Sequence, residues 1–243
     1  MTDMEFNWLG NPSSFIMAAD GVLDADLCTA AIKVIKTHYN NLFTAGPTWG
    51  GVRPLVKNSK DWTVEDSSLK QSGVNSPTID SLRGHAQLAM HLAISQYIEL
   101  NEALWYWPYR CDSGFRLQHY LKGAAFYRTH ADCTPWEPMA SGGQNPRVLG
   151  CIIYLNTVEV GGGTNFPQHN LICSAKAGRI ALFPAAWTHQ HAGMTPLSNE
   201  KYILSSFITS SVDKDEHDIP FESELTPLKE TVEPDQEEPE NDE

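Results

Sequence analysis

Hydrophobic and polar positions follow two different patterns along the chain. In the first hundred residues, apolar side chains recur at helical spacing in two stretches. The first predicts a helix over residues 24–40, with Asp24 as its N-cap. The second predicts a helix over residues 76–100, because Ser76-Pro77 places a proline in the first turn, where it is favoured.

The pattern changes at Tyr106, after which short runs of β-type residues alternate with turn residues. This arrangement favours a barrel or sandwich over alternating βα units. We therefore expect a mainly β protein with N-terminal helices, an α+β arrangement. The strands predicted in this part cover residues 115–120, 125–130, 147–155, 171–174, 179–183, 189–192 and 201–209.

Charge divides the chain more sharply than hydrophobicity does. The 243 residues include 30 acidic and 17 basic side chains, a net charge of −13. Residues 213–243 hold 14 of the acidic and 2 of the basic ones, which leaves 16 and 15 for residues 1–212. We expect residues 1–212 to form one domain and residues 213–243 to be an acidic, disordered tail, since the tail is too polar to form a core.

The nearly neutral domain argues against two classes of partner. A nucleic-acid-binding protein needs clustered Lys and Arg for phosphate contacts, and docking on anionic lipid needs a basic surface. We therefore expect no nucleic acid and no membrane as partners. No apolar run approaches the roughly 18 residues of a membrane span, and the N-terminus lacks a signal-peptide pattern, which favours a cytoplasmic location.

The five cysteines do not form a recognisable framework. Their number is odd and none occurs in a CxxC pair, so neither a set of disulfides nor a zinc knuckle is indicated.

A histidine and a carboxylate stand two residues apart in His130-Ala131-Asp132. On an extended segment both side chains project from one face, so the pair can bind a metal ion. A third ligand has to come from elsewhere, and His189 and His191 are the candidates. Two histidines and one carboxylate leave coordination positions open, which suits ferrous oxygenases better than closed structural zinc sites. Taken alone, a His-x-Asp pair is more often an ordinary core or surface pair.

The residues around this pair resemble the motifs of the Fe(II)- and 2-oxoglutarate-dependent dioxygenases, specifically the prolyl 4-hydroxylase-like branch. The resemblance covers about residues 22–209 and is densest over residues 120–207. The ordered set of motifs argues against chance agreement. It consists of Tyr120, Tyr127, His130-Ala131-Asp132, residues 152–156, 161–166 and 177–184, His191-Ala192-Gly193, and Lys201.

The resemblance implies a double-stranded β-helix, or jelly roll, as the core. It also implies that His130, Asp132 and His191 hold the metal and form the catalytic centre. The family's basic residue follows its second histidine by about ten positions, and Lys201 lies ten residues after His191 but twelve after His189. We expect His189 to be a neighbour of the site and not a ligand.

The same resemblance assigns the co-substrate contacts. Lys201 is expected to bind the far carboxylate of 2-oxoglutarate, with the Tyr154 hydroxyl beside it. Tyr120, ten residues before His130, is expected to contact the co-substrate near the metal. One departure concerns the substrate pocket, because Phe207 stands where the family has a tryptophan.

The activity implied by the resemblance is hydroxylation of an unactivated C–H bond, coupled to oxidative decarboxylation of 2-oxoglutarate. Its cofactors would be Fe(II), 2-oxoglutarate and O2, with ascorbate as an optional addition. The favoured substrate is a prolyl residue of a protein or peptide, and a free amino acid or another small molecule is the alternative. A non-catalytic jelly-roll module and a cupin-type metal protein are the rival classes.

Overall fold

The computed structural model describes residues 5–48, 50–101, 104, 109–111, 114–133 and 146–210. The chain divides into two units between Ser211 and Val212, and every described residue belongs to the first. The predicted tail, residues 213–243, therefore lies outside the described residues. So do residues 134–145, most of the stretch 133–146 whose Pro, Gly and Ser content predicts a long loop.

The two predicted N-terminal helices are present, and a third, shorter one lies between them. They are α1 (Ala25–Val34), continued by a π-helical segment at Ile35–Tyr39, α2 (Asp66–Gln71) and α3 (Pro77–Glu99). The Asp24 carboxylate accepts hydrogen bonds from two backbone N–H groups of the first turn of α1, which confirms it as the N-cap. None of the described helices combines the length and the apolar character needed to cross a membrane.

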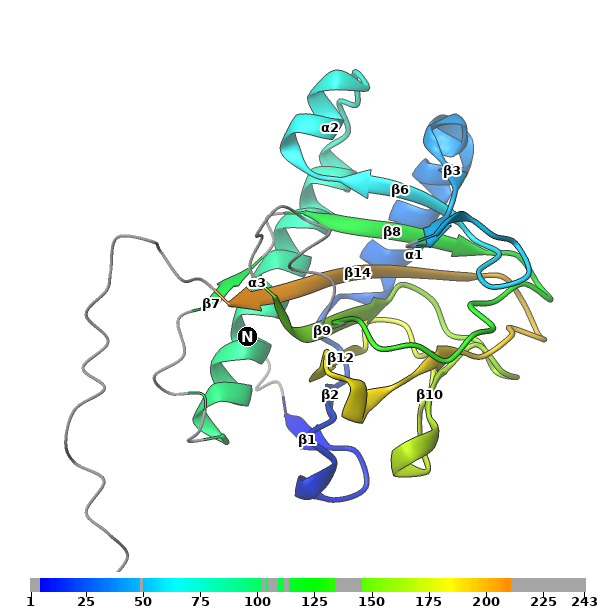
Figure 1. The fold of residues 1–243 in the computed structure, drawn as a ribbon. Coiled ribbons are helices and arrows are strands. Elements are labelled where there is room, and N and C mark those ends of the chain that lie inside the picture. Colours follow the sequence, from blue (N-terminus) through cyan, green and yellow to red (C-terminus); the bar gives the residue numbers. More distant parts are fainter. Residues whose placement is uncertain are drawn as a thin grey trace, which may run out of the picture. The chain divides into compact units, whose positions relative to one another are not determined.

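Most of the described strands form one large antiparallel sheet (Figure 1). The order across it is β1-β2-β12-β9-β14-β8-β6-β3, and β7 pairs with β14 beside this path. The long strands β9 and β14 lie at its centre and pair with each other. The bounds are β1 (Phe6–Trp8), β2 (Met17–Ala19), β3 (Thr44–Ala45), β6 (Lys60–Val64), β7 (Tyr109–Cys111), β8 (Phe115–Tyr120), β9 (Arg147–Tyr154), β12 (Ile180–Pro184) and β14 (Lys201–Ser210).

Two smaller sheets complete the described part. A three-stranded sheet has the order β11-β10-β13, formed by Leu171–Cys173, Thr164–Phe166 and Ala192–Gly193. A short hairpin joins β4 (Pro47–Thr48) to β5 (Gly51–Val52). Short 3-10 helices occupy Pro12–Ser14, Asn40–Leu42, Pro167–His169 and Trp187–His189.

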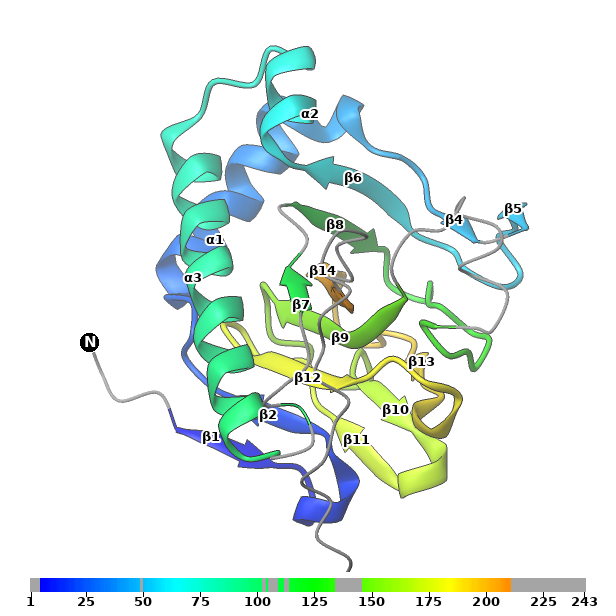
Figure 2. The same cartoon turned by 60° about the vertical axis from the view of Figure 1, so that its left-hand side comes forward.

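The central strands bury both faces, and each face has its own apolar core. Because side chains alternate along a strand, Leu117, Ile153 and Leu204 face the helices α1 and α3, which lie along one side of the large sheet (Figure 2). Tyr154 and Ile203 belong to the second core, which β10 and β11 also help to build. The expectation of a mainly β protein with N-terminal helices is confirmed, and the second face is where the predicted site residues gather.

One predicted strand is absent, and another is mostly replaced by a turn. Residues 125–130 form only two isolated bridges, Lys57 with Phe126 and His130 with His191. The other backbone hydrogen bonds of this segment join it to residues 56–58 and do not continue as a strand ladder. Residues 189–192 were predicted to be extended throughout, but a 3-10 turn at Trp187–His189 precedes the bridge at His191. The turn sends His189 in a different direction from His191.

We propose that residues 1–212 fold without the acidic segment that follows. Ending the chain after Val212 should leave the melting temperature nearly unchanged, because the described core is built from residues before that point. Calorimetry of the full and shortened chains measures this. A fall of many degrees in the shortened chain would show that residues 213–243 contribute to the folded domain.

Candidate active site

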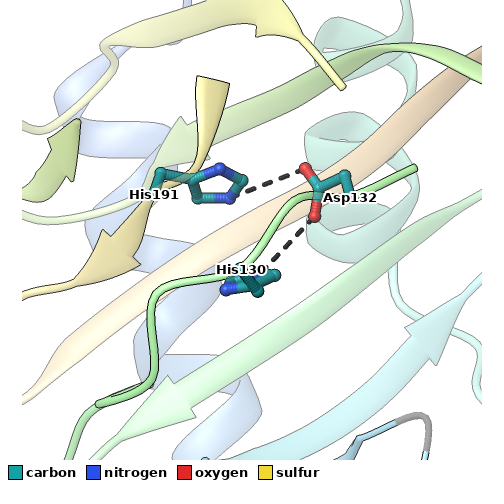
Figure 3. A group of neighbouring side chains, drawn as sticks. All are labelled: His130, Asp132 and His191. Carbon is teal, nitrogen blue, oxygen red and sulfur yellow. Dashed lines mark ion pairs between the residues drawn. The ribbon is translucent and has the colours of Figure 1, made fainter. Parts of the chain in front are cut away.

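Two segments that are distant in sequence meet at His130 and His191. The backbone N–H of His130 donates to the carbonyl of His191 at 2.9 Å, and the N–H of His191 donates to the carbonyl of His130 at 2.8 Å. This reciprocal bridge brings both imidazoles to Asp132, which stands two residues after His130 (Figure 3). Nε2 of His130 lies 3.5 Å from Oδ1 of Asp132, and Nε2 of His191 lies 3.6 Å from Oδ2.

The hydrogen bonds of the two rings leave their ligand atoms available. Nδ1 of His130 lies 3.1 Å from the carbonyl oxygen of Arg128, and Nδ1 of His191 lies 3.1 Å from that of His189. Because a carbonyl only accepts, each Nδ1 carries the proton, and Nε2 of a neutral ring keeps a lone pair. Burial lowers the pKa of His191, which favours that neutral form.

The carboxylate completes the donor set. Burial alone would raise the pKa of Asp132, but His191, His130 and Arg147 together lower it below its ordinary value, so Asp132 is ionised. One donor atom from each of the three residues lies within 4.8 Å of the others. Two imidazole nitrogens and one carboxylate oxygen at this spacing fit a divalent transition metal with open positions.

Aromatic rings and a glycine hold the three ligands in place. Phe126 stacks on His130 with ring centroids 3.9 Å apart, and Phe183 packs against His191 at 4.7 Å. On β9, a side chain at Gly150 would place its Cβ 2.7 Å from Oδ2 of Asp132. Only glycine allows the strand to approach the carboxylate this closely.

The ligand cluster opens into a cavity of about 890 Å³, and Lys201 lies on its wall. This lysine is 2% exposed, its Nζ donates to the carbonyl of Gly162 at 2.9 Å, and it lies 4.6 Å from the centroid of the Tyr120 ring. In the described part of the chain, no acidic side chain forms an ion pair with it. Burial lowers the pKa of Lys201 to about 8. A buried ammonium group beside a cavity and without a carboxylate partner fits an anionic ligand.

The two predicted tyrosines are both buried, but they differ in their access to the cavity. Tyr120 lines it, and its hydroxyl donates to Oε1 of Gln118 at 2.7 Å. The Tyr154 hydroxyl lies 2.7 Å from Oγ1 of Thr164 and donates to the carbonyl of Cys173 at 3.3 Å. Thr164 is the member of this pair that lines the cavity, so Tyr154 stands behind it.

His189 lies apart from the ligand cluster. Its Nε2 is 2.8 Å from the carbonyl of Ser14, its Nδ1 is 2.9 Å from Oγ1 of Thr188, and its ring stacks on His169 at 4.3 Å. The side chain is only 5% exposed and fully engaged in these contacts. The sequence-based choice of His191 over His189 agrees with this arrangement.

Residues 115–209 match the model of the 2OG-Fe(II) oxygenase superfamily. The chain carries a 2OG-Fe(II) oxygenase domain. It is a 2-oxoglutarate-dependent dioxygenase that uses Fe(II), with 2-oxoglutarate and O2 as co-substrates, as the motifs predicted. No curated protein sequence matches the chain.

Solved structures with the same architecture as this dioxygenase include three prolyl hydroxylases. The viral collagen prolyl hydroxylase of Paramecium Bursaria Chlorella virus-1, in complex with 2OG, has 18% identity and a TM-score of 0.55, over 81% of this chain and 97% of that one. A Pseudomonas putida prolyl-4-hydroxylase has 16% identity and a TM-score of 0.57, over 82% and 95%.

The third structure contains a bound peptide. It is a Trichoplax adhaerens prolyl hydroxylase in complex with a hypoxia inducible factor oxygen degradation domain peptide fragment, with 14% identity and a TM-score of 0.59, over 82% of this chain and 84% of that one. At these identities the likeness establishes the fold, and it confirms the predicted jelly-roll core of the dioxygenase.

Several residues of the dioxygenase site were not predicted from the sequence. They are Thr164, Gly150 and Arg147. The Arg147 guanidinium lies 3.7 Å from the centroid of the ring of Phe207, the residue already expected at the substrate pocket. A glycine within the apolar run of residues 147–155 was the available signal for Gly150. The stacking on Phe207 depends on the pairing of β9 with β14, which no local pattern reveals.

Replacing Gly150 by Ala should weaken metal binding, because the new methyl group would displace Asp132 or Phe183. We expect the Fe(II) dissociation constant to rise roughly ten- to hundredfold, as for other changes that shift a metal ligand. Anaerobic metal titration measures it. Gly84→Ala in α3 is the matched control, since a methyl group there meets nothing within 4 Å. Unchanged iron affinity in Gly150→Ala would contradict the role of this glycine.

Proposed function

We propose that this dioxygenase hydroxylates a prolyl residue of a protein or peptide, with Fe(II) held by His130, Asp132 and His191. Two findings support the proposal. The dioxygenase has the same fold as three proteins named prolyl hydroxylases, one of them with a peptide bound. The ligand cluster also opens into a large cavity instead of being closed over, which leaves room for a co-substrate and a peptide segment.

The observation that carries the proposal is the buried cation in the same cavity as the three metal ligands. 2-Oxoglutarate has a carboxylate and a keto group at one end, which can chelate a metal, and a second carboxylate at the other. Lys201 would bind that second carboxylate. The Thr164 hydroxyl would be the neutral hydrogen-bond donor beside it, which requires Tyr154 to donate to Thr164 in place of the Cys173 carbonyl. Tyr120 lines the cavity next to Lys201, where it would contact the co-substrate.

When bound, Fe(II) supplies the oxidising chemistry with O2 that converts 2-oxoglutarate to succinate and CO2 and inserts one oxygen atom into a C–H bond. The chain's own residues fix the positions of the reactants. The three ligands would hold the metal on one side, and Lys201 would fix the far end of the co-substrate. The apolar side chains of Phe126, Ile152 and Ile203 on the cavity wall would limit the access of water.

Mass spectrometry of peptides with a single proline tests the substrate assignment. Full-length protein, Fe(II), 2-oxoglutarate and O2 should add one oxygen atom to the proline of at least one peptide and form one succinate per hydroxylation. Turnover of 2-oxoglutarate with no peptide oxidised, but with a free amino acid hydroxylated, would replace the peptide assignment by a small-molecule one.

The metal-ligand assignment predicts a contrast between two neighbouring histidines. Replacing His130, Asp132 or His191 by Ala should abolish formation of succinate from 2-oxoglutarate, because each removal leaves too few ligands. His189→Ala should keep most of it, since His189 contacts Ser14 and Thr188 and not the cluster. Activity retained in His191→Ala and lost in His189→Ala would reverse the assignment.

The anchor assignment predicts both an affinity and a pH dependence. Lys201→Ala should raise the dissociation constant for 2-oxoglutarate about ten- to hundredfold, because one charge-assisted hydrogen bond is lost. In the unsubstituted chain the affinity should be highest below pH 7 and fall above pH 8, since the pKa of free Lys201 is about 8 and only the protonated form attracts the carboxylate.

Anaerobic titrations across pH measure both effects. Lys201→Arg is the control, because a guanidinium stays protonated throughout this range and should remove the fall in affinity. An affinity that is unchanged in Lys201→Ala would mean that another group binds the far carboxylate.

A further inference from the structure

The wall of the cavity carries far more positive than negative charge. Among the described residues that line it, the only carboxylate is Asp132, a proposed metal ligand, whereas six are basic. The whole of residues 1–212 has 16 acidic and 15 basic side chains, so this excess is local. The six basic residues are Arg53, Lys57, Arg116, Arg128, Arg147 and Lys201.

Three of the six already have a use. Lys201 is the proposed 2-oxoglutarate anchor. Lys57 is 4% exposed, and its Nζ lies 2.7 Å from Oδ2 of Asp61, so this pair is neutral overall. Arg147 stacks on Phe207 and donates to the backbone carbonyl of Asp132 at 3.1 Å.

The other three, Arg53, Arg116 and Arg128, are exposed and come from different elements. Arg53 follows β5, Arg116 lies on β8, and Arg128 stands two residues before the ligand His130. No ion pair joins any of the three to an acidic side chain in the described ranges. Three exposed guanidinium groups that line one cavity, without carboxylate partners in the described ranges, create a local positive potential that attracts an anion.

The co-substrate is too short to be that anion. In the pairing of β14 with β8, Lys201 stands opposite Tyr120 and Ser205 opposite Arg116, so Arg116 lies four residues along the strand from the anchor. At about 3.3 Å per residue this is roughly 13 Å, whereas the two carboxylates of a five-carbon dianion are only about 5 Å apart. An anion bound by Arg116 at this backbone separation from the anchor would therefore be a different one.

We propose that the substrate of this dioxygenase is an acidic peptide, whose Asp or Glu side chains next to the hydroxylated proline are bound by Arg53, Arg116 and Arg128. The proposal rests on the prolyl-peptide function above and adds the charge of the flanking residues to it. Guanidinium groups suit this role, because they stay charged and bind carboxylates in a two-pronged geometry.

Residues 230–243 of the chain itself supply a suitable probe. This segment contains Glu233-Pro234-Asp235 and Glu238-Pro239-Glu240, two prolines flanked by carboxylates on both sides. A labelled synthetic peptide of this sequence is compared with a neutral version in which every Glu is Gln and every Asp is Asn. Competition from the same segment of the full-length chain affects both peptides equally, so the ratio of their dissociation constants remains informative.

Fluorescence anisotropy measures binding to the full-length protein loaded with Fe(II) and 2-oxoglutarate without O2, so that nothing turns over. At low salt the acidic peptide should bind roughly ten- to hundredfold more tightly than the neutral one. Replacing Arg53, Arg116 and Arg128 together by Gln should remove this preference, and Arg116→Gln alone should reduce it about two- to fivefold. Raising the salt to about 1 M, where the screening length is about 3 Å, should also remove it.

Lys33→Gln is the control that matches Arg116→Gln in charge, because Lys33 is exposed on α1 and does not line the cavity. It should keep the full preference, and circular dichroism checks that each variant is folded. Equal affinity for the two peptides, or a preference that survives in the triple variant, would overturn the proposal. Because these are binding measurements, they are independent of the proline oxidation that tests the proposed function.

Discussion

The site depends on two backbone hydrogen bonds between His130 and His191. These residues lie far apart in the sequence, and the reciprocal bridge at 2.9 and 2.8 Å aligns them as in one rung of an antiparallel ladder. Asp132 follows His130 closely enough to reach both imidazoles, so one bridge orders all three donor atoms. Folding of the domain already fixes this bridge. The ligands therefore need little further ordering when a metal binds.

Charge distinguishes the parts of the cavity that lies beside this bridge. Near the ligands, the ionised Asp132 carboxylate and the Nε2 atoms of His130 and His191 suit a cation. Lys201, buried and without a carboxylate partner among the described residues, suits the distal end of a small dianion. Exposed Arg116 on β8, together with Arg53 and Arg128 from other segments, suits a second anion at a distance from Lys201 that 2-oxoglutarate does not span. Different parts of one cavity thus suit the metal, the co-substrate and the substrate.

The sequence predicted much of this arrangement, and its omissions have a common cause. The caps of α1 and α3 and the central strands could be predicted because local patterns mark them. Motif order singled out His130, Asp132, His191 and Lys201, which the fold gathers around one cavity, and their roles stay predictions. Residues 125–130 were wrongly predicted as a strand, and of residues 189–192 only Ala192 lies in one. Hydrophobic alternation does not encode the single bridges and the turn that these segments form instead. The basic cavity wall was missed because Arg53, Arg116 and Arg128 are scattered in sequence and only the tertiary fold collects them.

The central claim is that the three ligands and Lys201 act on one molecule of 2-oxoglutarate. Anaerobic absorption spectroscopy tests it most directly, because a 2-oxoglutarate that chelates Fe(II) through its carboxylate and keto group produces a weak visible charge-transfer band. The account predicts this band when 2-oxoglutarate is added to the Fe(II)-loaded full-length chain, and its loss in His191→Ala. Iron that binds to the chain without any such band on addition of 2-oxoglutarate would contradict the account.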